Sequence, residues 1–134
     1  MNNPLIEQYK NSTITLDETI SALDKSNFTE EEIKKGGIVY TPEYICDYIV
    51  ASLKPKLDES IMEPSVGHGI FLFSLLSYIE NTFGTSEVKK YYLNNFTGVD
   101  IESNNITELG ELVVVWFYKR NIDISHKEAS SRLI

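Results

Sequence analysis

The sequence predicts an α/β domain built on a small parallel sheet, preceded by short helices. Two short segments, at about 60–63 and 96–100, read as strands, and each is followed by a longer apolar segment with helical character. An order of strand, helix, strand, helix is typical of parallel strands joined by crossover helices. With 134 residues, 42% of them hydrophobic, the chain has enough material for one packed domain.

The first 35 residues are expected to form a helical extension, and the α/β domain is expected to occupy 36–134. Within the extension, Leu16, Ile20 and Leu23 recur at helical spacing. The simplest function for this region is packing against the rest of the domain.

The next helix is expected to run from about residue 42 to Pro55. Thr41 would be its N-cap, and Pro42 would occupy the first helical position, where a missing N–H costs nothing. Cys46 lies near the buried face and is expected to be a small core residue. Four larger apolar side chains fall along one face of this helix: Ile45, Tyr48, Ile49 and Leu53.

Beyond the first strand, the helix expected at 70–81 is apolar almost all round, which indicates that it is buried. Residues 82–95 are expected to be a linker that ends, at most, in part of a helix. A further helix is expected from Ser103 to about Arg120, and a third strand at 122–124.

Composition excludes several classes of function. The net charge is -8, and no cluster of Lys or Arg larger than a pair occurs, so the chain by itself lacks the basic face of a nucleic-acid binder. A single cysteine excludes an internal disulfide and a Cys-based zinc site, and suits a reducing compartment. No apolar run approaches the roughly 20 residues of a membrane span. We therefore expect a cytoplasmic protein without membrane contact.

The segment IMEPSVGHGIF, at 61–71, places a glycine turn between the first strand and the buried helix. Glycines here let a ligand approach the backbone, and the helix N-terminus favours polar or anionic groups. Asp100 follows the second strand, where a carboxylate can accept hydrogen bonds from ribose hydroxyls. The pattern is therefore that of a nucleoside-binding half-domain. A dinucleotide fingerprint fits less well, because position 72 is Leu and the acid follows Gly69 by 31 positions instead of about 20.

Three segments in order, YTPEYICDYIV, IMEPSVGHGIF and FTGVDIE, resemble the first three sequential motifs of adenine-N6 DNA methyltransferases of the gamma order. These enzymes use S-adenosyl-L-methionine and occur in restriction-modification systems. The resemblance covers about 36–105 and implies a partial Rossmann-like fold of the class I S-adenosylmethionine-dependent methyltransferases, with a parallel half-sheet.

The resemblance also implies roles for the matching positions. Residues of the first motif would approach the methionine end of the cofactor, and the turn of the second motif would pass under its methionine and ribose. Asp100 would bind the ribose, and Ile101 would lie beside the adenine. The positions of the first two motifs are Val39, Tyr40, Thr41, Glu63, Pro64, Gly67 and Gly69.

Structural explanations compete with these roles. Thr41 can be a cap alone, Glu63 a solvated acid at a strand end, and Asp100 a turn residue. His68 occupies a turn position that varies in the family, and we interpret it as a solvent-facing residue. Phe71, Phe73 and Trp116 are interpreted as core, and His126 as a surface residue.

The family's later motif, Asn/Asp-Pro-Pro-Tyr/Phe, holds the flipped adenine. The four prolines of this sequence are never adjacent, so the motif is absent and the sequence contains no predicted catalytic residue. We expect this chain to be the N-terminal cofactor-binding part of an adenine-N6 DNA methyltransferase, and we expect it to be inactive by itself. DNA contacts and the catalytic motif would come from a missing or separate C-terminal part or a complementing chain, and an exposed sheet edge could support oligomerisation. A non-catalytic cofactor-binding or interaction module is the alternative, and a NAD- or nucleotide-binding fragment is disfavoured.

Overall fold

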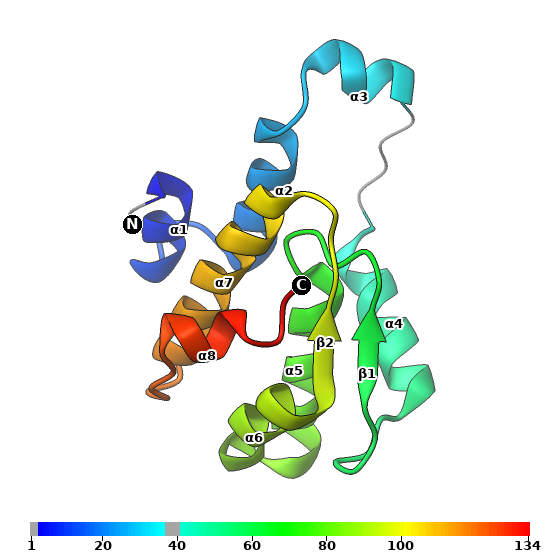
Figure 1. Ribbon diagram of the computed structural model, residues 1–134, viewed down its shortest axis with the longest axis vertical. Helices are drawn as coiled ribbons and strands as arrows, with labels where there is room; N and C mark the ends of the chain where they lie inside the picture. Colours follow the sequence, from blue (N-terminus) through cyan, green and yellow to red (C-terminus); the bar gives the residue numbers. More distant parts are fainter. Residues whose placement is uncertain (1–2, 37–40) are drawn as a thin grey trace.

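The computed structural model describes residues 3–36 and 41–134 (Figure 1). The elements of this part, in chain order, are α1 (Pro4–Lys10), α2 (Leu16–Ser26), α3 (Glu30–Gly36), α4 (Glu43–Leu53), β1 (Ile61–Glu63), α5 (Ile70–Phe83), α6 (Thr85–Asn95), β2 (Phe96–Gly98), α7 (Ser103–Tyr118) and α8 (His126–Ser130). The chain is thus a mixed, largely helical domain with a small parallel sheet.

The two predicted strands pair in parallel, as expected. Ile61 lies opposite Phe96, and Glu63 lies opposite Gly98. Beyond the strands, the Val99 N–H donates to the Glu63 carbonyl at 2.9 Å. Because both strands point the same way, the segments that follow them, the glycine turn and the loop at Asp100, leave the sheet at the same edge.

The prediction of a third strand at 122–124 is wrong, since no strand forms there. Strand pairing occurs later instead, where Leu133 bridges Gly98 in parallel orientation. The Gly98 N–H donates to the Arg132 carbonyl at 2.9 Å, and the Ile134 N–H donates back to the Gly98 carbonyl at 2.8 Å. The last residues therefore lie beside β2, on the side away from β1. In chain order, α8 lies between α7 and these residues.

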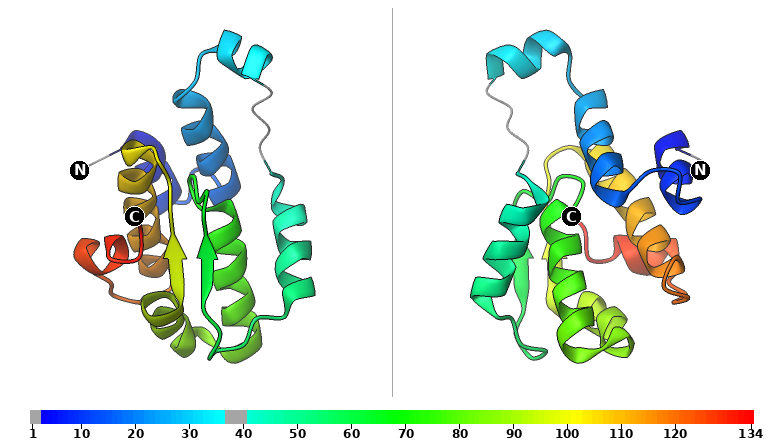
Figure 2. Two further views of the ribbon diagram at one scale, coloured as in Figure 1. Left: turned by 45° about the vertical axis from the view of Figure 1, so that its right-hand side comes forward. Right: turned by 180° about the vertical axis from the view of Figure 1, so that it is seen from behind.

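The helices α7 and α5 make the two largest contributions to the core. Viewed from behind, α4 and α5 lie across one face of the strands (Figure 2). Aromatic side chains join the core layers: the rings of Phe73 and Trp116 are 6.1 Å apart, and those of Tyr92 and Phe96 are 5.9 Å apart. As predicted, Trp116 and Phe73 are buried, and His126 is exposed, whereas Phe71 is only half-buried.

The N-terminal helices join the same core. Ile6 and Tyr9 of α1 and Ile20 and Leu23 of α2 are buried in one hydrophobic cluster with residues of α5 and α7. By contrast, α3 projects away from the other helices (Figure 1). The division at residue 36 remains a prediction.

Two helices differ from expectation. First, α4 begins at Glu43 with Pro42 as its N-cap, so Thr41 is not the N-cap, and Pro42 does not occupy the first helical position. Its buried side chains are Cys46, as predicted, and Val50, whereas Tyr48 is 74% exposed. The larger apolar face of α4 thus points outward.

Second, most of the predicted linker at 82–95 is the helix α6. It buries Val88, Tyr91 and Tyr92, which is why it packs against α5 instead of crossing the surface as coil.

In the described ranges, no helix combines the length and the apolarity that crossing a bilayer requires.

Candidate functional site at the glycine turn

The turn between β1 and α5 is held by one backbone hydrogen bond to the loop after β2 and by another within the turn itself. The Val66 N–H donates to the Val99 carbonyl at 2.8 Å, and the Gly69 N–H donates to the Val66 carbonyl at 2.9 Å. Gly67 and Gly69 have positive φ values of 55° and 87°. This left-handed conformation costs little only for glycine, so the turn that the sequence predicts is also sterically specified.

The two glycines differ in what surrounds them. A Cβ at Gly69 would lie 2.6 Å from Leu109 Cδ1, so any side chain there would force buried residues of α7 and α5 to move. A Cβ at Gly67 would meet nothing within 4 Å. Gly69 therefore fits the core, whereas Gly67 faces space that a ligand could occupy.

Asp100 contacts the turn directly. Its Oδ2 accepts from the Gly67 N–H at 2.9 Å and from Asn105 Nδ2 at 3.3 Å, and its Oδ1 accepts from the Glu102 N–H at 2.8 Å. An ionised carboxylate offers about four acceptor positions, so these three contacts leave capacity for a further donor. The structure thus brings together two predicted site residues that are 33 positions apart in sequence.

The other predicted residues lie around this contact or outside the described ranges. Glu63 ends β1, and its Oε1 accepts from the Ser65 N–H at 3.0 Å. Pro64 and Thr41 are exposed. Ile101 is 96% exposed, an unusual position for a branched apolar side chain next to a strand end. Val39 and Tyr40 lie outside the described residues.

The interpretation of His68 as a solvent-facing residue is wrong. Its side chain is fully buried, with Nδ1 2.5 Å from Asp24 Oδ1 on α2 and Nε2 3.0 Å from Glu108 Oε1 on α7. Burial alone lowers the pKa of the imidazole, but the hydrogen bonds and charges of the two carboxylates outweigh it and leave the pKa raised. Neither carboxylate stands out in the sequence, because each lies in an ordinary polar stretch of a helix.

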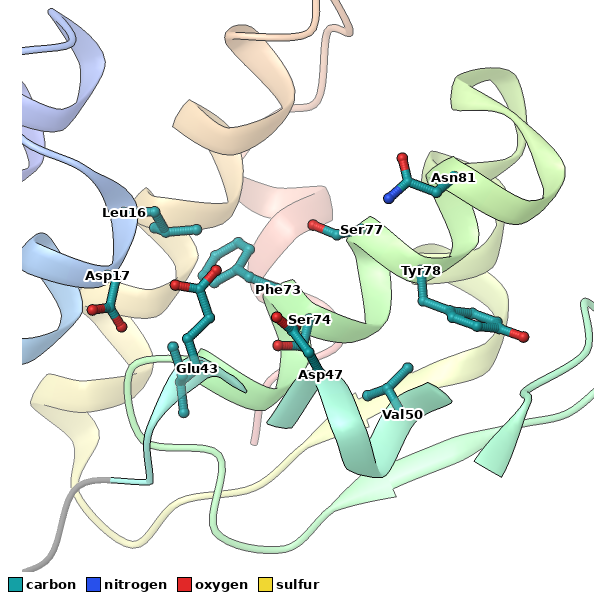
Figure 3. Close-up of a pocket in the computed structure, with 11 residues that line it drawn as sticks. Leu16, Asp17, Glu43, Asp47, Val50, Phe73, Ser74, Ser77, Tyr78 and Asn81 are labelled. Carbon is teal, nitrogen blue, oxygen red and sulfur yellow. The ribbon is translucent and has the colours of Figure 1, made fainter. Parts of the chain in front are cut away.

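A cavity of about 270 Å³ lies elsewhere, between α2, α4 and α5 (Figure 3). Its lining includes three carboxylates, from Asp17, Glu43 and Asp47, together with Ser74 and Tyr78. Burial, followed by the charges of Asp17 and Asp47, raises the pKa of Glu43. Among the predicted site residues that the structure describes, none lines this cavity, and its negative lining is unsuited to an anionic ligand group.

Comparison with known proteins is consistent with the motif-based expectation. The family model described as N-6 DNA methylase matches residues 25–129. A solved structure of the modification subunit assigned to a type I restriction enzyme of Vibrio vulnificus YJ016 is similar in fold, with a TM-score of 0.54 and 19% sequence identity. The match covers 92% of this chain but 23% of that subunit.

No curated protein matches this sequence. The family match nevertheless extends from the end of α2 into α8 and so includes the glycine turn, the loop at Asp100 and both strands. On that evidence, the chain belongs to the N-6 DNA methylase family.

Proposed function

We propose that this chain is the cofactor-binding part of a site-specific adenine-N6 DNA methyltransferase of a restriction-modification system. Its glycine turn and strand-end acid would bind S-adenosyl-L-methionine. One observation carries the proposal: the Gly67 N–H donates to the Asp100 carboxylate at 2.9 Å, so the turn and the acid form a single surface.

The residues present fit this cofactor. Open space beside Gly67 allows a ligand to approach the backbone, and Asp100 retains acceptor capacity for a ribose hydroxyl. The exposed side chain of Ile101 provides an apolar surface on which a purine could pack. Glu63 lies at the adjacent strand end, where its carboxylate could receive an ammonium group directly or through water.

Bound at this turn, S-adenosyl-L-methionine would supply an electrophilic methyl group. The chain itself would bind and orient it: Asp100 would hold the ribose, Gly67 would admit it to the backbone, and Ile101 would cover the base. Val39, Tyr40 and Thr41 would contact the methionine end, with Pro64 and Gly69 shaping the turn. None of these residues would receive or transfer a proton from the adenine acceptor.

DNA binding and methyl acceptance would be supplied by residues outside the printed sequence. The net charge of -8 gives this chain no electrostatic attraction for phosphates, and no adjacent prolines provide the family's acceptor motif. We therefore propose a complementing part, on the same or a separate polypeptide, that carries both. A non-catalytic binding module built on the same half-fold is the second candidate, favoured by the missing motif.

Calorimetric titration of the purified chain with S-adenosyl-L-methionine tests the proposal. We expect weak binding that Asp100→Ala reduces by about 1–3 kcal/mol, because a charged acceptor for the ribose is lost. Asp58→Ala is a matched control, since this exposed aspartate precedes β1 and lies outside the proposed site. Unchanged affinity in Asp100→Ala would remove this residue from the site.

Methyl transfer distinguishes the two candidate functions. We expect no transfer to DNA adenine by the chain alone, and transfer after addition of a complementing polypeptide that carries the Asn/Asp-Pro-Pro-Tyr/Phe motif. Tritium incorporation by the chain alone would contradict the assignment of catalysis to another part. Cofactor binding that no complementing polypeptide converts to transfer would favour the non-catalytic module.

A further inference from the structure

A buried histidine, His68, lies in the glycine turn between α2 and α7. The His68 ring is fully buried, whereas the side chains of Asp24 and Glu108 retain 25% and 21% exposure. One ring nitrogen contacts each carboxylate, at 2.5 Å and 3.0 Å. The turn is thereby connected to α2 on one side and to α7 on the other.

This geometry requires a particular protonation state. An ionised carboxylate can only accept hydrogen bonds, and a neutral imidazole has only one N–H to donate. When both carboxylates are ionised, the two contacts of His68 can be hydrogen bonds only if the ring carries two protons and a positive charge. The balance of effects on its pKa agrees, because the two carboxylates outweigh the burial that disfavours the charge.

The cluster extends to the N-terminus and to the candidate cofactor site. Asn3, the N-cap of α1, donates from Nδ2 to Glu108 Oε2 at 3.0 Å. Asn27, the C-cap of α2, donates to Asn105 Oδ1 at 3.1 Å, and Asn105 in turn contacts Asp100. The N-terminal helices thus reach the candidate ribose acid by one route through His68 and another through Asn105.

We propose that His68 is a positioning residue whose imidazolium, held between Asp24 and Glu108, fixes the glycine turn against the N-terminal helices and so sets how well the turn receives its ligand. The connection between turn and helices rests on the contacts alone, whereas the effect on ligand affinity rests on the proposed function. His68 would contact neither methyl donor nor DNA, and would act through the neighbouring backbone of Gly67 and Gly69.

The direction of the pH dependence follows from the raised pKa. A group whose pKa is higher in the folded than in the unfolded state contributes its full stabilisation at low pH and loses it as pH rises through the folded value. The facing charges are Asp24 from α2 and Glu108 from α7, with Glu111 the next carboxylate on α7. Deprotonation of His68 would leave the carboxyl groups of Asp24 and Glu108 facing a neutral ring instead of a cation.

Hydrogen exchange of the wild-type chain tests the connection without a variant. Histidine carbon–proton NMR signals would follow the titration of His68, with the exposed His126 as an internal reference. Over the same pH range, protection factors of the Gly67 amide and the α2 amides should fall roughly tenfold, the scale of a lost hydrogen bond between charged groups. Protection factors already correct for the intrinsic pH dependence of exchange.

A pair of variants provides the comparison. His68→Gln should show lower protection that no longer changes with pH, whereas His126→Gln, the same substitution on an exposed histidine, should behave as wild type. Constant protection through the titration of His68, or a His68 ring that is neutral at pH 6, would overturn the proposal.

Cofactor titration across the same pH range separates the two proposals. We expect affinity for S-adenosyl-L-methionine to fall by a similar factor as His68 loses its proton. Absence of binding at every pH, with pH-dependent protection intact, would contradict the proposed function and leave the connection standing. Affinity that stays constant while protection falls would overturn the assignment of His68 to ligand positioning.

Discussion

Gly67 and Gly69 are two positions apart, yet the structure constrains them for different reasons. Both have a positive φ, which disfavours any L-residue with a side chain. Only Gly69 also has a neighbour, Leu109 Cδ1, inside the radius that a methyl group would need. A sequence pattern of two glycines cannot show this difference, because it depends on α7, a helix that begins 34 positions later.

Alanine substitution at each glycine should separate these effects. Gly69→Ala combines backbone strain with overlap against the core, and we expect a loss of about 2–5 kcal/mol in the free energy of unfolding. Gly67→Ala, with strain alone, should lose about 1–2 kcal/mol. Urea denaturation followed by circular dichroism measures both, and equal losses would contradict the packing role of Gly69.

For single residues, the glycine turn and the strand-end acid can be predicted from the sequence, whereas the two carboxylates that surround His68 cannot. Glycine spacing and a following acid are local patterns, so they can be recognised in the sequence alone. Asp24 and Glu108 lie 44 and 40 positions from His68, in helices whose polar residues are otherwise unremarked. Their convergence depends on how α2 and α7 pack, which no local pattern contains.

Among the secondary-structure elements, α6 carries two adjacent tyrosines with opposite hydrogen-bonding situations. The Tyr92 hydroxyl donates to the Ala129 carbonyl on α8 at 2.5 Å. The Tyr91 hydroxyl is buried and has no hydrogen-bond partner in the described part of the chain. Burial, with a smaller contribution from Glu59, raises the pKa of Tyr91 to about 12, so the group stays neutral at ordinary pH.

Phenylalanine at each position tests this asymmetry. Tyr92→Phe should lower the free energy of unfolding by about 1–2 kcal/mol, because the Ala129 carbonyl is left without its donor. Tyr91→Phe should be neutral or slightly stabilising, since it removes a buried hydroxyl that makes no bond. Thermal or urea denaturation of the two variants supplies the comparison. A larger loss in Tyr91→Phe than in Tyr92→Phe would contradict the observed pairing.

The predictability of the elements follows the length of their patterns. The helix α5 was predicted at 70–81 and observed over Ile70–Phe83, because a long apolar run between a glycine turn and a glycine leaves few alternatives. The segment that forms α6 reads as a linker ending, at most, in part of a helix, because only three of its side chains are buried and its sequence shows no long apolar stripe. The pairing at residues 132–134 spans too few residues for any periodicity to appear.

For the whole molecule, the free edge of the sheet at β1 and the outer face of α4 both expose apolar side chains. β1 has β2 on one side and no strand on the other within the described residues. Met62, in the middle of β1, is 63% exposed, and Tyr48 and Leu53 on α4 are 74% and 59% exposed. An unpaired strand edge next to an apolar helix face favours association.

We therefore expect the chain to self-associate as its concentration rises, through the β1 side. Met62→Lys places a charge on the free strand and should shift the equilibrium toward monomer, whereas Met62→Leu should leave it unchanged. Analytical ultracentrifugation over a range of concentrations measures the effect. A monomer at all concentrations, or equal association in both variants, would argue against this surface.

The pairing of the last residues, 132–134, with β2 and the loop after it has a practical consequence for measuring ligand binding. The Asp100 N–H donates to the carbonyl of Ile134 at 3.0 Å, so the last residue of the printed sequence adjoins the candidate ribose acid. A fluorophore attached through a short linker after Ile134 would lie near the backbone of Asp100, and we expect its emission to change when S-adenosyl-L-methionine binds.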